Sequence, residues 1–290
     1  MSTPMRRAPR LVLSTTSLDV PVRAARDRSL EVANRFRESE SLAVALVKAI
    51  EAGAEALYAV PSPALRAALD ELKRPVPVLA RLPHLPLGDD LRHEHALLIP
   101  THDENPDVWS GMRAGIAAVS MLPASLQGDL AVRVAQRIEH EAASLGSRDV
   151  IGVAIAPEIT DLALAAGHAR FFERMVRFGR SRFGGVAGFE TRDLAYLVRR
   201  LHEWGIEPDF LIAAANPAGV GMTPVPLEVE VALERPGIPV LASELRGGGV
   251  GALAEGARYA LEHGALGLLP DLVDLDDVGG ELRALKVLLG

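Results

Sequence analysis

The stretch GGVAGFETRDLAYLVRRLHEWGIEPDFLIAAAN, residues 184–216, decides the fold class of this chain. It holds a helical pattern between two short apolar runs, GGVAGFE and DFLIAAAN. Inside the helical pattern, apolar residues recur with the period of one helix face, at Leu194, Leu197, Val198 and Leu201. The apolar runs are too short for helices and lack polar alternation, which is typical of strands buried on both faces. The stretch therefore predicts a strand, a helix and a second, parallel strand.

Capping signals mark the two ends of this helix. We expect Thr191 to cap its start, and Asp193 suits the positive end of the helix dipole. Gly205 can end the helix in a left-handed conformation.

The same alternation runs along most of the chain. Apolar runs that predict strands begin near residues 11, 56, 76, 149, 184, 209, 238 and 265. We therefore expect residues 1–290 to form one (β/α)8 barrel domain. An open doubly wound sheet is the alternative, but no glycine-rich phosphate turn follows the first expected strand.

Two segments interrupt the alternation. Residues 21–38 are polar and rich in arginine, and we expect a loop there. Residues 83–123 are rich in proline, and we interpret them as an inserted loop or lid between the third strand and the following helix.

Composition argues against nucleic acid and membranes as binding partners. The net charge is −7 with scattered basic residues, which argues against nucleic acid. No apolar run reaches the roughly 20 residues of a membrane span, and no signal-peptide core is visible. The chain has no cysteine, which fits a reducing compartment. We expect a cytoplasmic protein that binds a small molecule, and these features permit a homo-oligomer.

Polar residues at the ends of the expected strands form the candidate site. In a (β/α)8 barrel such residues face the active site. The candidate catalytic residues are Tyr58, Arg81, Glu190 and Glu244. A tyrosine hydroxyl beside a guanidinium can donate a proton or stabilise an oxyanion. Alternatively, Tyr58 packs under the insertion and Arg81 only pairs with Glu190 or Glu244.

A second group of residues is expected to bind a ligand. In the segment ELRGGGVG, residues 244–251, backbone N–H groups could cradle an anion, with Arg246 adding charge. The alternative is a tight turn that needs positive φ angles. The candidate ligand-binding residues are Asn216, Ser243, Arg246, Gly247 and Gly248.

Metal and Schiff-base chemistry receive less support. The insertion contains four histidines, namely His84, His93, His95 and His102. His93 and His95 would share one face of a strand, but no third ligand is fixed by spacing, so we predict no metal site. The three lysines, Lys48, Lys73 and Lys286, all lie in or at the end of expected helices. A Schiff-base aldolase would need a lysine at a strand end.

The order of segments resembles the aldo-keto reductase superfamily. AIEAGAEALYAV is similar to the helix and strand that precede that family's catalytic aspartate, and VPVLARL to its strand VVIATKV. GGVAGFETRDLAYLVRRL is similar to its IRAIGVSNFTVEQLEEL, and IPVLASELRGGGVGALA to its IGVVAYSPLGRGGL. The resemblance covers residues 10–82 and 124–290, and it implies a barrel that reduces carbonyls with NADPH.

The resemblance also implies where the functional residues should lie. The family uses an Asp, a Tyr, a Lys and a His, whereas here Tyr58 occupies the Asp position and Arg81 the Lys position. Neither the Tyr nor the His is retained. Acidic residues stand where basic ones would hold the 2′-phosphate of NADPH, at Asp271, Asp274, Asp276 and Asp277. We therefore expect NADPH to bind weakly or not at all, and the cofactor stays unknown.

Three functions are consistent with these observations. The first is a divergent enzyme on an aldo-keto-reductase-like barrel that acts on a small carbonyl-bearing or anionic metabolite without the usual tetrad. The second is an NAD(P)-dependent oxidoreductase with atypical cofactor contacts. The third is a non-catalytic barrel that binds a metabolite or a partner protein. We expect the first, with Tyr58 and Arg81 acting on the substrate and Glu190 or Glu244 transferring protons.

Overall fold

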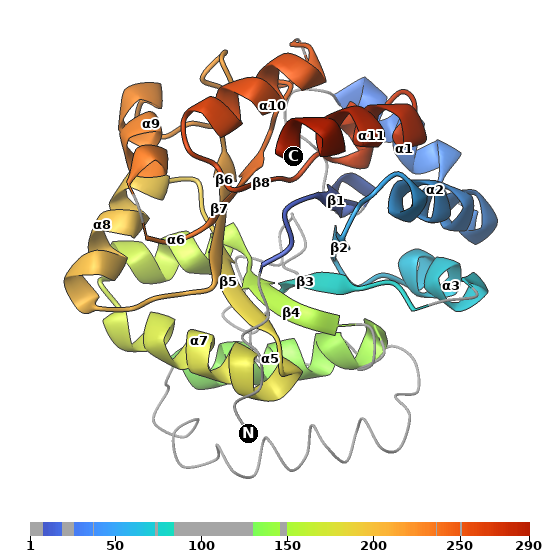
Figure 1. Ribbon diagram of the computed structural model, residues 1–290. Coiled ribbons are helices and arrows are strands. Elements are labelled where there is room, and N and C mark those ends of the chain that lie inside the picture. Colours follow the sequence, from blue (N-terminus) through green and yellow to red (C-terminus); the bar gives the residue numbers. More distant parts are fainter. Residues whose placement is uncertain are drawn as a thin grey trace.

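The protein is a barrel of eight parallel strands surrounded by helices (Figure 1). The computed structural model describes residues 8–18, 26–36, 38–72, 75–83, 130–145, 150–235, 237–249 and 251–290. The strands follow one another around the sheet in sequence order, as right-handed βαβ crossovers require. The predicted (β/α)8 architecture is therefore confirmed. The predicted insertion at 83–123 lies, apart from Pro83, outside the described residues.

The barrel closes between its first and last strands. The strands are β1 Val12–Ser14, β2 Ala56–Ala59, β3 Val78–Leu82, β4 Val150–Ile155, β5 Val186–Glu190, β6 Phe210–Ala214, β7 Val240–Ser243 and β8 Gly267–Leu268. Because β8 has two residues, β1 meets the last segment only through isolated bridges, which join Leu11 to Leu268 and Ser14 to Asp271.

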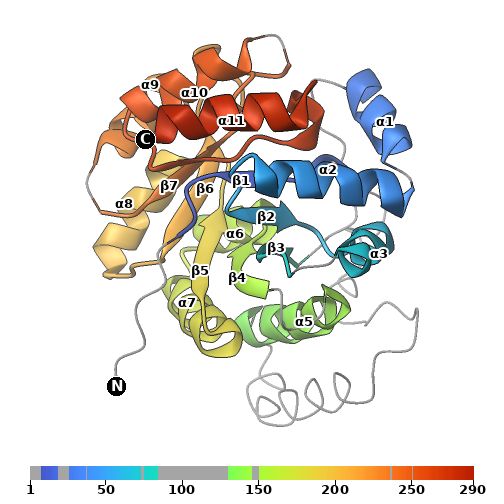
Figure 2. The ribbon, with the colours of Figure 1, turned by 45° about the vertical axis from the view of Figure 1, so that its right-hand side comes forward.

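Helices surround the sheet, most of them on its outer face. They are α1 Arg26–Arg35, α2 Ser39–Glu51, α3 Pro63–Glu71, α5 Leu130–Leu145, α6 Pro157–Ala165, α7 Ala169–Phe183, α8 Leu194–Trp204, α9 Pro226–Glu234, α10 Leu253–Glu262 and α11 Val278–Leu289. Two short 3-10 helices, η1 Thr16–Leu18 and η4 Leu272–Asp274, follow β1 and β8. In Figure 2, the first and last barrel helices, α2 and α11, lie side by side. None of these helices is long and apolar enough to cross a membrane.

Apolar side chains fill the inside of the barrel. The interior cluster includes Val12, Tyr58, Leu79, Phe210, Ile212, Leu241 and Leu269. Gly188 makes room for the Phe210 ring, because a Cβ at this glycine would lie 2.7 Å from two ring carbons. The barrel is thus a packed core rather than a channel, and a ligand cannot bind inside it.

The helix that decided the fold starts with a different cap from the one expected. Asp193, not Thr191, is the N-cap residue of α8, and its carboxylate accepts a hydrogen bond from the Tyr196 amide at 3.0 Å. The Thr191 hydroxyl instead donates to Asp161 at 2.7 Å. At the other end, Gly205 adopts a left-handed conformation with φ 64°, as predicted.

The prediction of a loop across residues 21–38 is wrong for residues 26–35. Residues Arg26–Arg35 form helix α1, which contacts η1 and η4. Val32 and Phe36 lie one turn apart and are buried, so these two residues supply the apolar face. Helix α6 between β4 and α7 was not predicted either.

Candidate functional site

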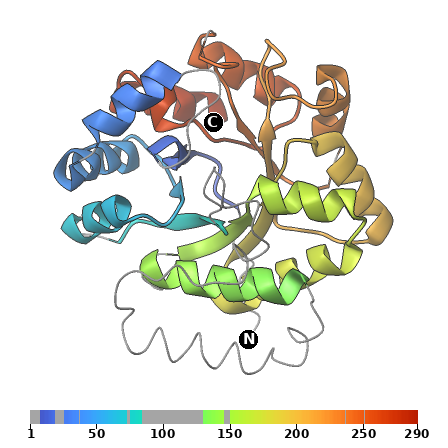
Figure 3. The same ribbon diagram turned by 180° about the vertical axis from the view of Figure 1, so that it is seen from behind.

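Polar side chains gather where the strands end, at the carboxyl-terminal mouth of the barrel. In Figure 3, which views the barrel from behind, the yellow-green helix α6 lies in front of the strands. Side chains alternate along a strand, so residues two positions beyond an interior residue also face inward. By this rule Ser14 follows Val12, Arg81 follows Leu79, and Ser243 follows Leu241. Sequence interpretation placed candidate residues at this end, and the strand register does so too.

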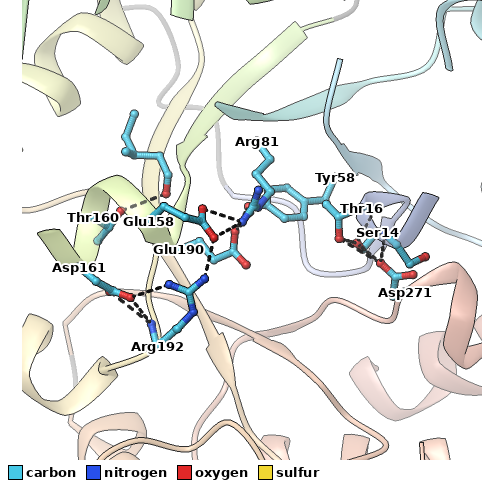
Figure 4. Close-up of polar contacts among 12 residues, drawn as sticks. Ser14, Thr16, Tyr58, Arg81, Glu158, Thr160, Asp161, Glu190, Arg192 and Asp271 are labelled. Carbon is cyan, nitrogen blue, oxygen red and sulfur yellow. Dashed lines mark hydrogen bonds and ion pairs between the residues drawn. The ribbon is translucent and has the colours of Figure 1, made fainter. Parts of the chain in front are cut away.

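Tyr58, Arg81 and Glu190 make direct contact (Figure 4). The Tyr58 hydroxyl donates to Glu190 Oε2 at 2.7 Å, and Arg81 Nε donates to the same oxygen at 2.6 Å. Tyr58 and Arg81 are 1% and 5% exposed, whereas the Glu190 side chain is 23% exposed. Two buried groups therefore hold a carboxylate that solvent still reaches.

Helix α6 extends this cluster with two further carboxylates. Arg81 Nη2 donates to Glu158 Oε2 at 3.1 Å, and Arg192 Nη2 donates to Glu158 Oε1 at 2.6 Å. Asp161, one turn further along α6, accepts from the Thr191 hydroxyl and from the Arg192 backbone amide. The result is a chain of alternating charge that runs from Arg81 to Asp161 and ties α6 to the end of β5.

Burial and charge shift the pKa values of this cluster in opposite directions. Burial raises the pKa of Tyr58 well above its ordinary value, and the neighbouring Glu190 carboxylate raises it further. Burial would also raise the pKa of Glu158, but Arg81 and hydrogen bonds outweigh it and hold that pKa below its usual range. For Asp161, burial prevails and raises the pKa. Tyr58 is therefore a neutral hydrogen-bond donor, while Glu158 is an anion.

A second polar cluster joins β1 to the segment after β8. Asp271 Oδ2 accepts hydrogen bonds from the Ser14 hydroxyl at 2.5 Å, the Thr16 hydroxyl at 3.1 Å and the Ser17 amide at 3.3 Å. Asp271 and Asp274 also form a capping box around η4. Burial, followed by repulsion from Asp271 and Glu244, raises the pKa of Asp274 to about 7.

The predicted ligand-binding loop is held by contacts within the protein. Asn216 is fully buried, and its side-chain amide donates to the Val220 carbonyl while its oxygen accepts from the Val220 amide. Arg246 donates to the carbonyls of Gly251 and Asp274 at 3.0 and 2.9 Å.

Its glycines have the geometry of a tight turn. Gly247 and Gly248 have φ angles of 54° and 80°, and the Gly247 amide donates to the Glu244 carbonyl. A side chain at Gly247 would also lie 2.9 Å from Asn216 Oδ1. These contacts agree with the turn that was weighed as the alternative to an anion cradle. Ser243 ends β7 beside this turn, and Glu244 is exposed.

Sequence interpretation missed part of the site. Of the first cluster, Glu158 was expected only as a strand-end residue that faces the site, and Asp161 and Arg192 were not expected there. A local signal was present, because Pro157 and Glu158 directly follow an apolar strand, and proline followed by an acidic residue often opens a helix. The contact of Arg192 with α6 depends on how β4 and β5 pair, which no local pattern encodes.

The histidines and lysines weighed for metal and Schiff-base chemistry lie partly outside the described residues. His84, His93, His95 and His102 lie outside the described residues, and within the described part of the chain no group of His, Asp and Glu could hold a metal ion. Lys48 and Lys286 lie on the outer helices α2 and α11, and Lys73 lies outside the described residues.

An apolar cavity of about 590 Å³ lies between α2 and α3, away from both polar clusters. Its lining includes Ala43, Val44, Val47, Ile50 and Leu72. It brings together none of the strand-end side chains, so we place the candidate site at the barrel mouth.

Comparisons with known proteins give no family for this chain. No family model matches it, and no curated protein matches it. Among solved structures, a protein named "QR15, an Aldolase" is similar over 99% of this chain and 97% of its own, with 12% sequence identity and a TM-score of 0.46. That protein is an aldolase by name, not an aldo-keto reductase.

The predicted membership of the aldo-keto reductase superfamily is therefore wrong. The functions derived from it are withdrawn as well, including the oxidoreductase and the binding-only alternatives. The physical reason is that the resemblance rested on the order and spacing of strands and helices, which all (β/α)8 barrels share. The argument about NADPH used the same alignment and loses its basis with it.

Proposed function

We propose that this protein is an enzyme that transfers protons to and from a small organic substrate at the mouth of the barrel. Glu190 is the acid–base group, and Tyr58 and Arg81 position it. The observation that supports this most is the convergence of two buried side chains, from β2 and β3, on one partly exposed carboxylate at the end of β5. Buried polar groups that converge on an accessible carboxylate are common in active sites.

The two partners leave one oxygen of Glu190 for the substrate. Tyr58 and Arg81 both donate to Oε2, and among the described residues no other hydrogen bond or ion pair reaches the carboxylate. In the proposed step, Oε1 forms a bond with a substrate hydrogen, and the electron pair of the broken bond stays on the substrate. The return step delivers this proton to the substrate, so Glu190 ends as a carboxylate again.

Glu190 is a better candidate for this role than Glu244. Glu244 lies at the other side of the mouth, is exposed, and has a positive φ of 54° that its turn requires. The described hydrogen bonds of Tyr58 and Arg81 go to Glu190 and Glu158 rather than to Glu244. An acid–base group needs a fixed position, and the contacts of Glu190 supply it.

A lysine Schiff base is not part of this proposal. Lys286 lies on α11 and its ammonium pairs with Glu55 at 2.7 Å, while Lys48 lies on α2. No lysine among the described residues lies at the barrel mouth. The likeness to the solved aldolase therefore brings no Schiff-base mechanism to this chain.

The competing explanation is a purely structural ion-pair network. Such networks contribute little net stability compared with apolar packing, although breaking one is costly. The two explanations differ in what Glu190→Gln does, because glutamine keeps the size and one hydrogen-bond acceptor but cannot take up a proton.

The test is turnover in deuterated water. Mixtures of small metabolites are incubated with the protein in D2O, and proton NMR detects both new products and exchange of carbon-bound hydrogen. We expect the wild-type protein to act on at least one compound, Glu190→Gln to lose at least about 100-fold, and Tyr58→Phe to lose about tenfold.

Asp209→Asn is the matched control. Asp209 pairs with Arg180 near the start of β6, at the opposite end of the barrel. This variant should keep full activity. A Glu190→Gln protein that is folded and as active as the wild type would contradict the proposed function.

A further inference from the structure

The charges of the barrel mouth identify the class of substrate. The two polar clusters and the turn after β7 together carry six carboxylates and three arginines. The carboxylates are Glu158, Asp161, Glu190, Glu244, Asp271 and Asp274, and the arginines are Arg81, Arg192 and Arg246. The excess is negative even when one carboxyl group is protonated.

All three arginines already pair with carboxylates or carbonyls of the protein itself. Arg81 lies between Glu190 and Glu158, and Arg192 lies between Glu158 and Asp161. Arg246 donates to two backbone carbonyls. An anionic substrate would have to break these contacts and would approach a mouth of its own sign.

The positive ends of the helix dipoles offset the negative charge of the mouth only in part. Each N-terminus carries about half a positive charge, and helices of a parallel barrel start at the mouth. Acidic residues occupy several of these starts, including Asp193 at α8, Asp277 at α11 and Glu158 in the first turn of α6. The side-chain charges therefore determine the sign of the electrostatic potential at the mouth, which is negative.

One buried polar atom near Asp271 has no partner among the described residues. The Ser17 side chain is 3% exposed, and its hydroxyl makes no hydrogen bond there, although its backbone amide donates to Asp271. An unsatisfied buried hydroxyl is uncommon and calls for an explanation. Its lone pairs can accept a hydrogen bond from a donor that arrives with a ligand.

We propose that the substrate carries a protonated amine, which binds on the Asp271–Asp274–Glu244 side of the mouth while Glu190 transfers protons on the other. This inference rests on the proposed function, since it concerns the same site. A neutral polyol would form hydrogen bonds but leave the negative excess uncompensated. An ammonium group supplies both a charge and three donors.

The absence of cysteine allows a direct measurement of the charge in the mouth. A single cysteine is introduced by Ser243→Cys, at an inward-facing position on β7. Its rates of modification by a cationic and by an anionic methanethiosulfonate reagent are compared. The reference is Ala67→Cys on the exposed face of α3, between Arg66 and Asp70.

At low ionic strength we expect the ratio of cationic to anionic rates to be at least about tenfold higher at position 243 than at position 67. The excess should shrink when Glu190→Gln and Glu244→Gln are added, and when salt is raised. An equal or lower ratio at position 243 would overturn the inference.

The NMR mixtures separate this inference from the proposed function. They contain equal numbers of amine-bearing, neutral and acidic compounds, and the inference requires that the converted compound bears an amine. Conversion of acidic compounds alone overturns it while the proposed function stands. If Glu190→Gln proves fully active, the proposed function fails, and the thiol rates still decide the charge of the mouth.

Discussion

At the scale of single residues, Arg81 shows how one side chain can organise a site. Its guanidinium contacts two carboxylates from different elements, Glu190 at the end of β5 and Glu158 on α6. Burial disfavours its charge, yet these carboxylates outweigh that effect and raise its pKa above the ordinary value. A guanidinium presents several donors in a fixed plane, which a lysine ammonium cannot reproduce.

Arg81→Lys should therefore destabilise the protein although it conserves charge. An ammonium at the end of a flexible chain cannot hold both carboxylates, and one buried charged hydrogen bond is lost. We expect the free energy of unfolding in urea to fall by about 1–3 kcal/mol. Arg177→Lys, in an exposed pair with Glu173, is the control and should change it by less than about 0.5 kcal/mol. Equal effects of the two substitutions would refute the bridging role.

Asp274 makes a separate prediction about pH. Its pKa of about 7 in the folded protein lies above the ordinary 3.8, so the folded state keeps a proton that the unfolded chain releases. The stability that comes from this group is present below about pH 4 and is lost as the pH rises towards 7. The free energy of unfolding should fall by about 2–4 kcal/mol more in the wild type than in Asp274→Asn across this range. Urea titrations at several pH values measure this difference, and parallel pH profiles would disprove the shift.

At the scale of elements, the start of α8 depends on a hydrogen bond that the sequence left ambiguous. Two residues near this point, Thr191 and Asp193, are both good N-caps by type. The structure uses Asp193 as the cap and directs Thr191 to Asp161 on α6. The contact with Asp161 thus removes Thr191 as a cap and leaves Asp193. This choice depends on how α6 packs against β5, which the local sequence does not reveal.

Asp193→Ala removes the side-chain acceptor for the Tyr196 amide. We expect a loss of about 1 kcal/mol in the free energy of unfolding. Asp277 is the matched control, because it occupies the N-cap position of α11 without a side-chain capping hydrogen bond. Asp277→Ala should cost only a few tenths of a kcal/mol, the contribution of a charge near a helix N-terminus. If Asp277→Ala costs as much as Asp193→Ala, the assigned cap does not stabilise α8.

At the scale of the whole molecule, the sequence predicts the barrel better than the site. Buried strands and amphipathic helices have local periodicities, so the eight βα units were visible, and strand ends then placed Tyr58, Arg81 and Glu190 together. Helix α1 was not predicted, because its apolar face consists of little more than Val32 and Phe36 among polar residues. The contacts of Arg192, Glu158 and Asp161 join elements through tertiary packing, and no periodicity reports that. The family assignment was wrong for a related reason, since the alternation of strands and helices is common to all (β/α)8 barrels and does not indicate which reaction a barrel catalyses.

The closure of the barrel gives the last prediction, which concerns global stability. Strand β8 has only two residues and pairs with little of β1. Asp271 adds side-chain hydrogen bonds at this junction, because it accepts from the Ser14 and Thr16 hydroxyls and from the Ser17 amide. Asp271→Ala removes the acceptor that these partly buried donors share; the Ser14 and Thr16 hydroxyls, 2.9 Å apart, can still bond to each other, and each donor left unpaired costs about 1–3 kcal/mol. We expect the free energy of unfolding in urea, measured by tryptophan fluorescence, to fall by at least about 3 kcal/mol. Glu173→Ala on the surface of α7 should be nearly neutral. A loss below about 1 kcal/mol for Asp271→Ala would mean that the backbone bridges alone close the barrel.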